Sequence, residues 1–216
     1  METVPIYLMP GMGANYKIFE YLTFPDKFEV FYLNWLIPQK NEELSHYVLR
    51  IRQQIKHENP ILIGVSFGGI IIQELSKYIS VRQLILISTI KHQDELPPLY
   101  KIVKNFGLYQ LFPFKLTKYH QALKKVAIHQ KLQQKIKIYN RYFKVTDPYY
   151  IKWSVYQVLH WKQTKELKNY IHIVGEKDIV FPVKYIKDPK IIVSDGSHEM
   201  IIFKARHISN LLQNLL

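Results

Sequence analysis

Gly64-Val65-Ser66-Phe67-Gly68-Gly69 joins a short apolar run to a helix-like run in this sequence of 216 residues. The preceding run, Pro60–Ile63, is typical of a buried strand, and the following run, Ile70–Leu75, is typical of the first turns of a helix. Gly64, Ser66 and Gly68 fit the pattern G-x-S-x-G, in which a serine sits on a strained turn between a strand and a helix. Such a turn needs glycine neighbours because the backbone is crowded there. The helix that follows would direct its N-terminal dipole toward a developing negative charge, which makes Ser66 a candidate nucleophile.

The other glycines point to the same edge of the molecule. The chain has only 8 glycines, and all except Gly107 fall in four loops, each of which follows a short apolar run. In a parallel α/β sheet, functional sites form outside the carboxyl ends of the strands. We therefore expect a site where these loops meet. The loop glycines are Gly11, Gly13, Gly64, Gly68, Gly69, Gly175 and Gly196.

The alternation of strand-like and helix-like segments predicts an α/β fold, with a minimal, mostly parallel sheet of about six strands and helices on both faces. The expected strands are Pro5–Met9, Phe28–Leu33, Ile61–Val65, Leu84–Ser88, Tyr170–Val174 and Lys190–Val193. The expected helices are Tyr16–Leu22, Glu42–Lys56, Gly69–Tyr78 and His207–Leu216. Residues 91–168 interrupt this pattern as a helical insertion, so the core is expected to comprise residues 1–90 and 169–216.

Length and composition are typical of one soluble globular domain with a sizeable core. Hydrophobic residues make up 48% of the chain and charged residues 22%. No run of about 18 apolar residues predicts a membrane span, and the first residues lack the basic region and cleavage site of a signal peptide. The chain contains no cysteine, which excludes disulfides and a cysteine nucleophile. We expect a cytoplasmic location.

The positive charge is concentrated in the insertion. Residues 91–170 contain 16 of the 30 basic residues, 4 of the 17 acidic residues and 15 of the 30 aromatic residues. One interpretation is a solvated helical surface, and another is an electrostatic guide for anionic substrates or an anionic surface. Nucleic-acid binding is not expected, because no recognised binding motif accompanies the charge. Helical apolar spacing is evident at Leu116, Tyr119, Leu123, Val126 and Ala127.

A serine nucleophile needs a base, and the base needs an acid that orients it. Among the 9 histidines, His198 follows a strand-like run and a turn, so its loop can reach Ser66 without distorting an element. His172 lies inside a strand pattern, where a structural role is the expectation. The candidate acid is Asp178, directly after the preceding strand, with Glu176 as an alternative in the same loop. Asp195 precedes a glycine and fits ordinary turn chemistry.

These motifs together resemble a compact α/β-hydrolase. The resemblance runs from Val4 to the end of the chain apart from the insertion, and it rests on four elements in the expected order. They are Met9-Pro10-Gly11-Met12-Gly13, which is similar to the His-Gly oxyanion loop with proline in place of histidine; the G-x-S-x-G turn; Gly175-Glu176-Lys177-Asp178-Ile179-Val180-Phe181-Pro182; and Gly196-Ser197-His198. The family's two opening strands have no counterpart, and the insertion is large relative to the core.

The resemblance implies that Ser66 is the nucleophile, His198 the base and Asp178 its orienting acid. It also implies an oxyanion hole formed by the backbone N–H groups of Met12 and Phe67, and a cap formed by the insertion. The implied activity is hydrolysis of an ester or thioester through an acyl-enzyme, with no cofactor and no metal. Acyl transfer, amide or carbon–carbon hydrolysis and a non-enzymatic ligand-binding role are alternatives on the same fold. The expected partner is a small-molecule substrate with an apolar portion, and the basic charge hints at an anionic one.

Overall fold

A computed structural model describes residues 3–114 and 140–216, and in it six strands form one sheet in the order β2-β1-β3-β4-β5-β6. All five neighbouring pairs are parallel, for example with Leu62 of β3 opposite Tyr7 of β1 and Leu84 of β4. The prediction of six strands in a mostly parallel sheet is confirmed. The strands are β1 (Val4–Met9), β2 (Phe28–Tyr32), β3 (Ile61–Val65), β4 (Gln83–Ile87), β5 (Tyr170–Gly175) and β6 (Ile191–Val193).

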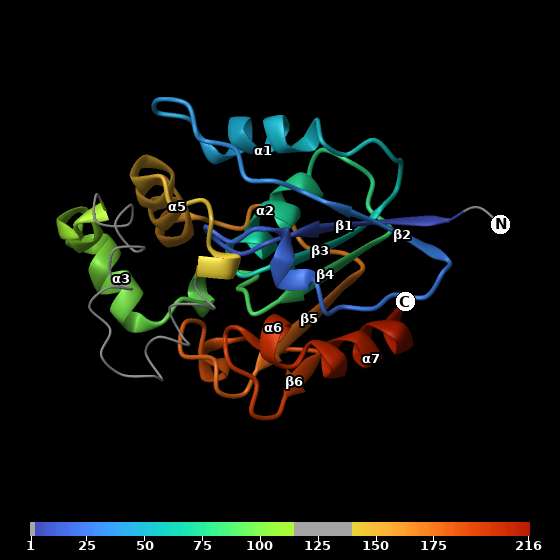
Figure 1. Ribbon diagram of the computed structural model, residues 1–216. Coiled ribbons are helices and arrows are strands. Elements are labelled where there is room, and N and C mark those ends of the chain that lie inside the picture. Colours follow the sequence, from blue (N-terminus) through green and yellow to red (C-terminus); the bar gives the residue numbers. More distant parts are fainter. Residues whose placement is uncertain (1–2, 115–139) are drawn as a thin grey trace.

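Helices cover both faces of this sheet, with α1 and α2 on one side and α6 and α7 on the other (Figure 1). The α-helices are α1 (Leu44–Arg52), α2 (Phe67–Leu75), α3 (Pro98–Asn105), α5 (Pro148–His160), α6 (Met200–Phe203) and α7 (Ala205–Leu215). Short 3-10 helices are η1 (Tyr16–Phe19), η2 (Gln93–Glu95), η3 (Leu108–Leu111) and η6 (Val183–Tyr185).

Several helix boundaries differ from the expected ones. The segment expected as helix Tyr16–Leu22 forms only the 3-10 helix η1, and α1 is shorter than Glu42–Lys56. Glu42 lies outside α1 because its carboxylate accepts hydrogen bonds from the Gln39 backbone and from Arg50. The helix after the G-x-S-x-G turn begins at Phe67 instead of Gly69, and α7 begins at Ala205 instead of His207.

Alternating residues of the strands fill two separate cores, one on each face of the sheet. In β1, Tyr7 and Met9 pack toward α1 and α2, whereas Ile6 and Leu8 pack toward η1, α6 and α7. All five residues of β3 are buried, because helices cover this strand on both sides. This explains why its sequence is a continuous apolar run instead of an alternating one.

The described part of the insertion contains η2, α3, η3 and α5, and of these α3 and α5 lie beyond the carboxyl ends of the strands (Figure 1). Helix α5 packs into the same core as α1 and α2, where Tyr150 and Trp153 are buried beside Trp35 and Phe67. Helix α5 of the insertion is therefore continuous with the core. The helical apolar spacing noted at Leu116, Tyr119, Leu123, Val126 and Ala127 lies outside the described residues.

None of the helices in residues 3–114 and 140–216 combines the length and the apolar character that crossing a bilayer requires.

Candidate active site

Ser66 occupies the turn between β3 and α2 in a strained backbone conformation, with φ 55° and ψ −124°. A non-glycine residue at positive φ costs on the order of 1–3 kcal/mol and persists only where its surroundings fix it. Here the Ser66 N–H donates to the Ile87 carbonyl over 2.9 Å. The Ser66 carbonyl accepts from the Thr89 hydroxyl over 2.7 Å and from the Gly69 N–H over 2.9 Å. The end of β4 thus holds the turn in its strained shape.

Close backbone packing explains the glycines around Ser66. A Cβ atom on Gly64 would lie 2.5 Å from the carbonyl oxygen of Gly68. A Cβ atom on Gly68 would collide with the carbonyl oxygens of Met9 and Pro10. The start of α2 is therefore pressed against both its own strand and the end of β1. Larger side chains at these two positions would push Ser66 away from the loop after β1.

Three side chains predicted from the sequence meet at the carboxyl edge of the sheet. Ser66 Oγ lies 2.9 Å from His198 Nε2, and His198 Nδ1 lies 2.8 Å from Asp178 Oδ2. Because a carboxylate only accepts hydrogen bonds, His198 carries its proton on Nδ1. Its Nε2 lone pair therefore accepts a hydrogen bond from the Ser66 hydroxyl. The chain order and the geometry match a serine, histidine and aspartate relay.

Asp178 is fixed by its own loop. Its Oδ1 accepts the N–H groups of Val180 and Phe181 over 2.8 and 2.9 Å, which leaves Oδ2 to face His198. The residue is only 4% exposed, so the carboxylate is held by three hydrogen bonds away from solvent. Its orientation, and with it that of the imidazole, is therefore determined by the backbone of residues 178–181.

Two aromatic side chains to which the sequence assigned no role lie on the side of the site that carries His198 and Asp178. The edge of the Phe181 ring packs against the His198 imidazole, with centroids 5.6 Å apart. Tyr100, from α3 of the insertion, packs against Phe181, and its pKa is raised by burial and then by the negative charge of Asp178. The insertion thus places Tyr100 close to Asp178. Phe181 lies within the motif from Gly175 to Pro182, but no feature of the sequence marks it or Tyr100 as part of the site.

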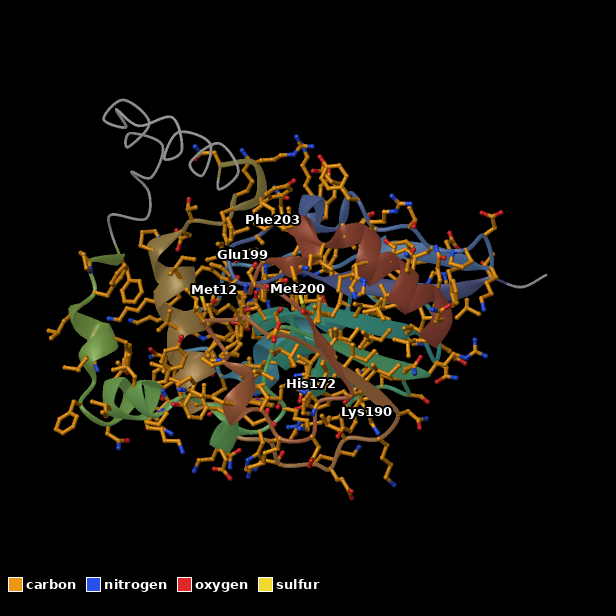
Figure 2. The ribbon with its side chains drawn as sticks, turned by 90° about the horizontal axis from the view of Figure 1, so that it is seen from below. Met12, His172, Lys190, Glu199, Met200 and Phe203 are labelled. Carbon is orange, nitrogen blue, oxygen red and sulfur yellow. The ribbon has the colours of Figure 1, made fainter. Side chains whose placement is uncertain are left out.

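The two backbone N–H groups expected to form an oxyanion hole belong to Phe67, which directly follows Ser66, and to Met12, which follows Gly11. Neither N–H donates a hydrogen bond to another of the described residues. Gly11 lies against the serine, since a Cβ atom placed on it would be 3.4 Å from Ser66 Cβ. Figure 2 shows Met12 and Glu199, the neighbour of His198, at the same end of the sheet. Two N–H groups that have no partner among the described residues, on loops that meet at Ser66, could bind an oxyanion.

The loop that carries Met12 is held by residues far away in the sequence. Trp35 Nε1–H donates to the Gly11 carbonyl over 2.9 Å, and its ring stacks on Phe67 with an interplanar angle of 5°. The Gly13 N–H donates to the buried hydroxyl of Tyr150 over 3.2 Å. Burial raises the pKa of Tyr150 well above its usual range, so this phenol remains neutral. Trp35 therefore contacts both parts of the candidate oxyanion hole, and α5 supports one of them.

The remaining candidates have other roles. His172 is fully buried in β5, its Nε2–H donates to the Thr89 carbonyl over 2.8 Å, and burial lowers its pKa. Glu176 accepts from the Asp195 N–H over 2.9 Å and does not contact His198, while Asp195 pairs with Lys177. In residues 3–114 and 140–216, no group of three or more His, Asp or Glu side chains is arranged to hold a metal ion.

No protein-family model matches the sequence, and no curated protein matches it significantly. Solved structures, in contrast, resemble the whole chain. A lipase-esterase related protein from Clostridium acetobutylicum is 17% identical with a TM-score of 0.65, and the match covers 100% of this chain and 95% of that one. The esterase EaEST from Exiguobacterium antarcticum is 16% identical with a TM-score of 0.69, over 98% of this chain and 91% of that one.

A third similar structure is an α/β-hydrolase fold protein from Burkholderia ambifaria. It is 14% identical with a TM-score of 0.66, and the match covers 99% of this chain and 91% of that one. At such identities the likeness concerns the path of the backbone, which agrees with the strand order and the strained turn described above. The chain therefore has the α/β-hydrolase fold.

Proposed function

We propose that the protein is a serine hydrolase that cleaves a carboxylic ester or thioester through an acyl-enzyme intermediate. The observation that carries this proposal is the pair of hydrogen bonds from Ser66 through His198 to Asp178, of 2.9 and 2.8 Å, on a serine held at positive φ. A serine hydroxyl is a weak nucleophile until a neighbouring base accepts its proton. This arrangement supplies that base in the correct tautomer.

In the first half of the reaction, Ser66 Oγ attacks the carbonyl carbon while its proton moves to His198 Nε2. The carbonyl oxygen becomes negatively charged and accepts hydrogen bonds from the N–H groups of Met12 and Phe67. Asp178 stabilises the imidazolium that forms, because its Oδ2 faces Nδ1. When the tetrahedral intermediate collapses, the alcohol or thiol leaves with the proton from Nε2, and Ser66 remains acylated.

In the second half, a water molecule takes the place of the leaving group beside His198. His198 Nε2 accepts one proton from this water as its oxygen attacks the acyl carbon. Collapse of the second tetrahedral intermediate releases the carboxylic acid and returns the proton to Ser66 Oγ. An acyl acceptor other than water would turn the same cycle into acyl transfer. Residues 91–168 would act as the cap over this site, contributing Tyr100 on one side and Tyr150 on the other.

The test is turnover of a p-nitrophenyl ester panel and a matched thioester panel by the wild-type protein and by Ser66→Ala. We expect the wild-type protein to hydrolyse at least one of these esters and Ser66→Ala to lose at least 10³-fold in kcat. Thermal melting of the variant should be nearly unchanged, since the substitution removes one hydroxyl from a turn that backbone contacts hold. Full activity in pure Ser66→Ala would refute the assignment of the nucleophile. A wild-type protein inert toward the whole panel would favour a ligand-binding role.

A further inference from the structure

An apolar cavity of about 460 Å³ lies beside the loop that follows β1. Met12 and Gly13 form one wall, and residues of η3, the segment before α5 and α5 itself form the others. No charged side chain lines it among the described residues. Cavities of this size and character accommodate the apolar part of a small molecule. Besides Met12 and Gly13, the lining consists of the hydrophobic residues Phe112, Phe114, Phe143, Val145, Ile151 and Val155 and the hydroxyl-bearing residues Tyr109 and Thr146.

The walls nearest to Met12 are tied to its loop by backbone hydrogen bonds. The Gly13 carbonyl accepts the N–H groups of Lys144 and Val145, each over 3.0 Å. Next along the chain, Ala14 pairs with Phe143 as an antiparallel bridge. The cavity wall and the loop that carries Met12 are therefore one hydrogen-bonded unit, which makes this side of the cavity a built feature of the fold.

The position of the cavity relative to the histidine distinguishes the two ends of a substrate. The leaving group must lie on the His198 side, because it takes its proton from Nε2. No residue of the loops that carry Asp178 and His198, residues 175–200, contributes to the cavity lining. The lining instead includes Met12, whose N–H is a proposed oxyanion donor and which follows Gly11, the residue that lies against Ser66. A group that extends from the bound carbonyl into this cavity is thus on the side away from the leaving group.

We infer that this cavity binds the acyl chain of the substrate and selects an uncharged, medium-length chain. This inference rests on the proposed function, which supplies the position of the carbonyl group. A longer acyl chain buries more apolar surface, and each buried methylene is expected to raise kcat/KM roughly fourfold until the cavity is full. An acyl chain that ends in a carboxylate is expected to be at least tenfold poorer than its uncharged counterpart, because nothing in the described lining would neutralise the charge.

The experiment measures kcat/KM for p-nitrophenyl esters from acetyl to decanoyl, and for alkyl acetates of the same lengths. Val155→Phe, on α5, partly fills the cavity, and Val103→Phe makes the same change on α3 at a residue that does not line it. We expect Val155→Phe to lower kcat/KM for octanoyl esters at least tenfold and for acetyl esters less than twofold. Val103→Phe should leave both unchanged, and thermal melting of both variants checks that they fold.

Three results would overturn the inference: no dependence on acyl length, dependence on alcohol length instead, or an equal loss for all chains in Val155→Phe. A second variant, Ile151→Ala, enlarges the cavity and should move the optimum to longer chains. A protein that hydrolyses no ester at all would refute the proposed function independently of the cavity. The cavity is then tested by calorimetric titration of Ser66→Ala with octanamide and acetamide. Tighter binding of octanamide, weakened in Val155→Phe, supports the acyl site, and equal binding of the two amides contradicts it.

Discussion

Among single residues, Asp178 shows how a loop directs a carboxylate toward a histidine. Its two oxygens are divided between the backbone of its own loop and the His198 imidazole. Glu176, two residues earlier, is engaged by Ser194 and the Asp195 N–H instead. Two acidic residues of one loop thus have separate tasks, and only one of them faces the histidine.

We expect Asp178→Asn to lower kcat roughly 10³- to 10⁴-fold, because an amide that donates to His198 favours the wrong tautomer. The loss should be smaller than that of Ser66→Ala. Glu176→Gln is the matched control, and it should retain at least half of the wild-type kcat. The opposite result, with Glu176→Gln inactive and Asp178→Asn unaffected, would move the acid to Glu176.

His198 should account for the response of the enzyme to acid. A protonated imidazole has no lone pair to accept the Ser66 proton, so activity is expected to fall as the pH is lowered. His198→Ala should lose nearly as much kcat as Ser66→Ala. The control is His172→Gln, which alters a buried histidine outside the hydrogen bonds that join Ser66, His198 and Asp178.

 His172 bonds to the Thr89 carbonyl and has no contact with Ser66, so its replacement should leave the shape of the pH profile unchanged. A flat profile in the wild-type protein, together with an active His198→Ala, would contradict the assignment of the base.

Among the structural elements, α5 is joined to the loop after β1 by a hydrogen bond that the sequence did not predict. The G-x-S-x-G turn was predictable because its glycines and its apolar flanks are local signals. The bond from Gly13 to Tyr150 joins positions 137 residues apart, and no local pattern marks it. The start of α5 did carry a signal: Asp147 caps the helix and Pro148 occupies its first turn, whereas the sequence analysis used neither to predict a helix.

Tyr150→Phe tests whether α5 positions the Met12 loop. The substitution keeps the ring but removes the acceptor of the Gly13 N–H, so we expect kcat to fall about tenfold with little change in KM. Tyr149→Phe is the matched control, because the neighbouring hydroxyl bonds to Asn41 and Gln39 at an exposed position. Equal kinetic effects of the two variants, or a loss of stability with kcat unchanged, would contradict a positioning role for Tyr150.

Across the whole molecule, the sequence predicted the parallel sheet well because its strands are short apolar runs that end in glycine loops. It predicted the packing of the insertion less well, since burial of Tyr150 and Trp153 depends on contacts with distant residues. The basic charge of the insertion is known from the sequence, which places 16 basic residues there. Those between 115 and 139, including Lys124, Lys125, Lys131 and Lys135, lie outside the described residues.

A salt titration tests whether this charge guides substrates. If it does, kcat/KM for an ester with an anionic leaving group should fall as salt is raised, while a neutral ester with the same acyl chain changes little. Screening acts over a Debye length of about 8 Å at physiological ionic strength, so guidance by exposed lysines is readily weakened. Replacing Lys124, Lys125, Lys131 and Lys135 with glutamine should mimic high salt. An equal salt response of both esters would identify the charge as a solvated surface.

The central claim is that Ser66 is an activated nucleophile, and covalent labelling with a fluorophosphonate measures this most directly. Intact-mass analysis of the wild-type protein should show a single adduct, and peptide mapping should place it on Ser66. Ser66→Ala should remain unlabelled under the same conditions, and His198→Ala should label much more slowly. A folded wild-type protein that forms no adduct, or an adduct that persists in Ser66→Ala, would contradict the account.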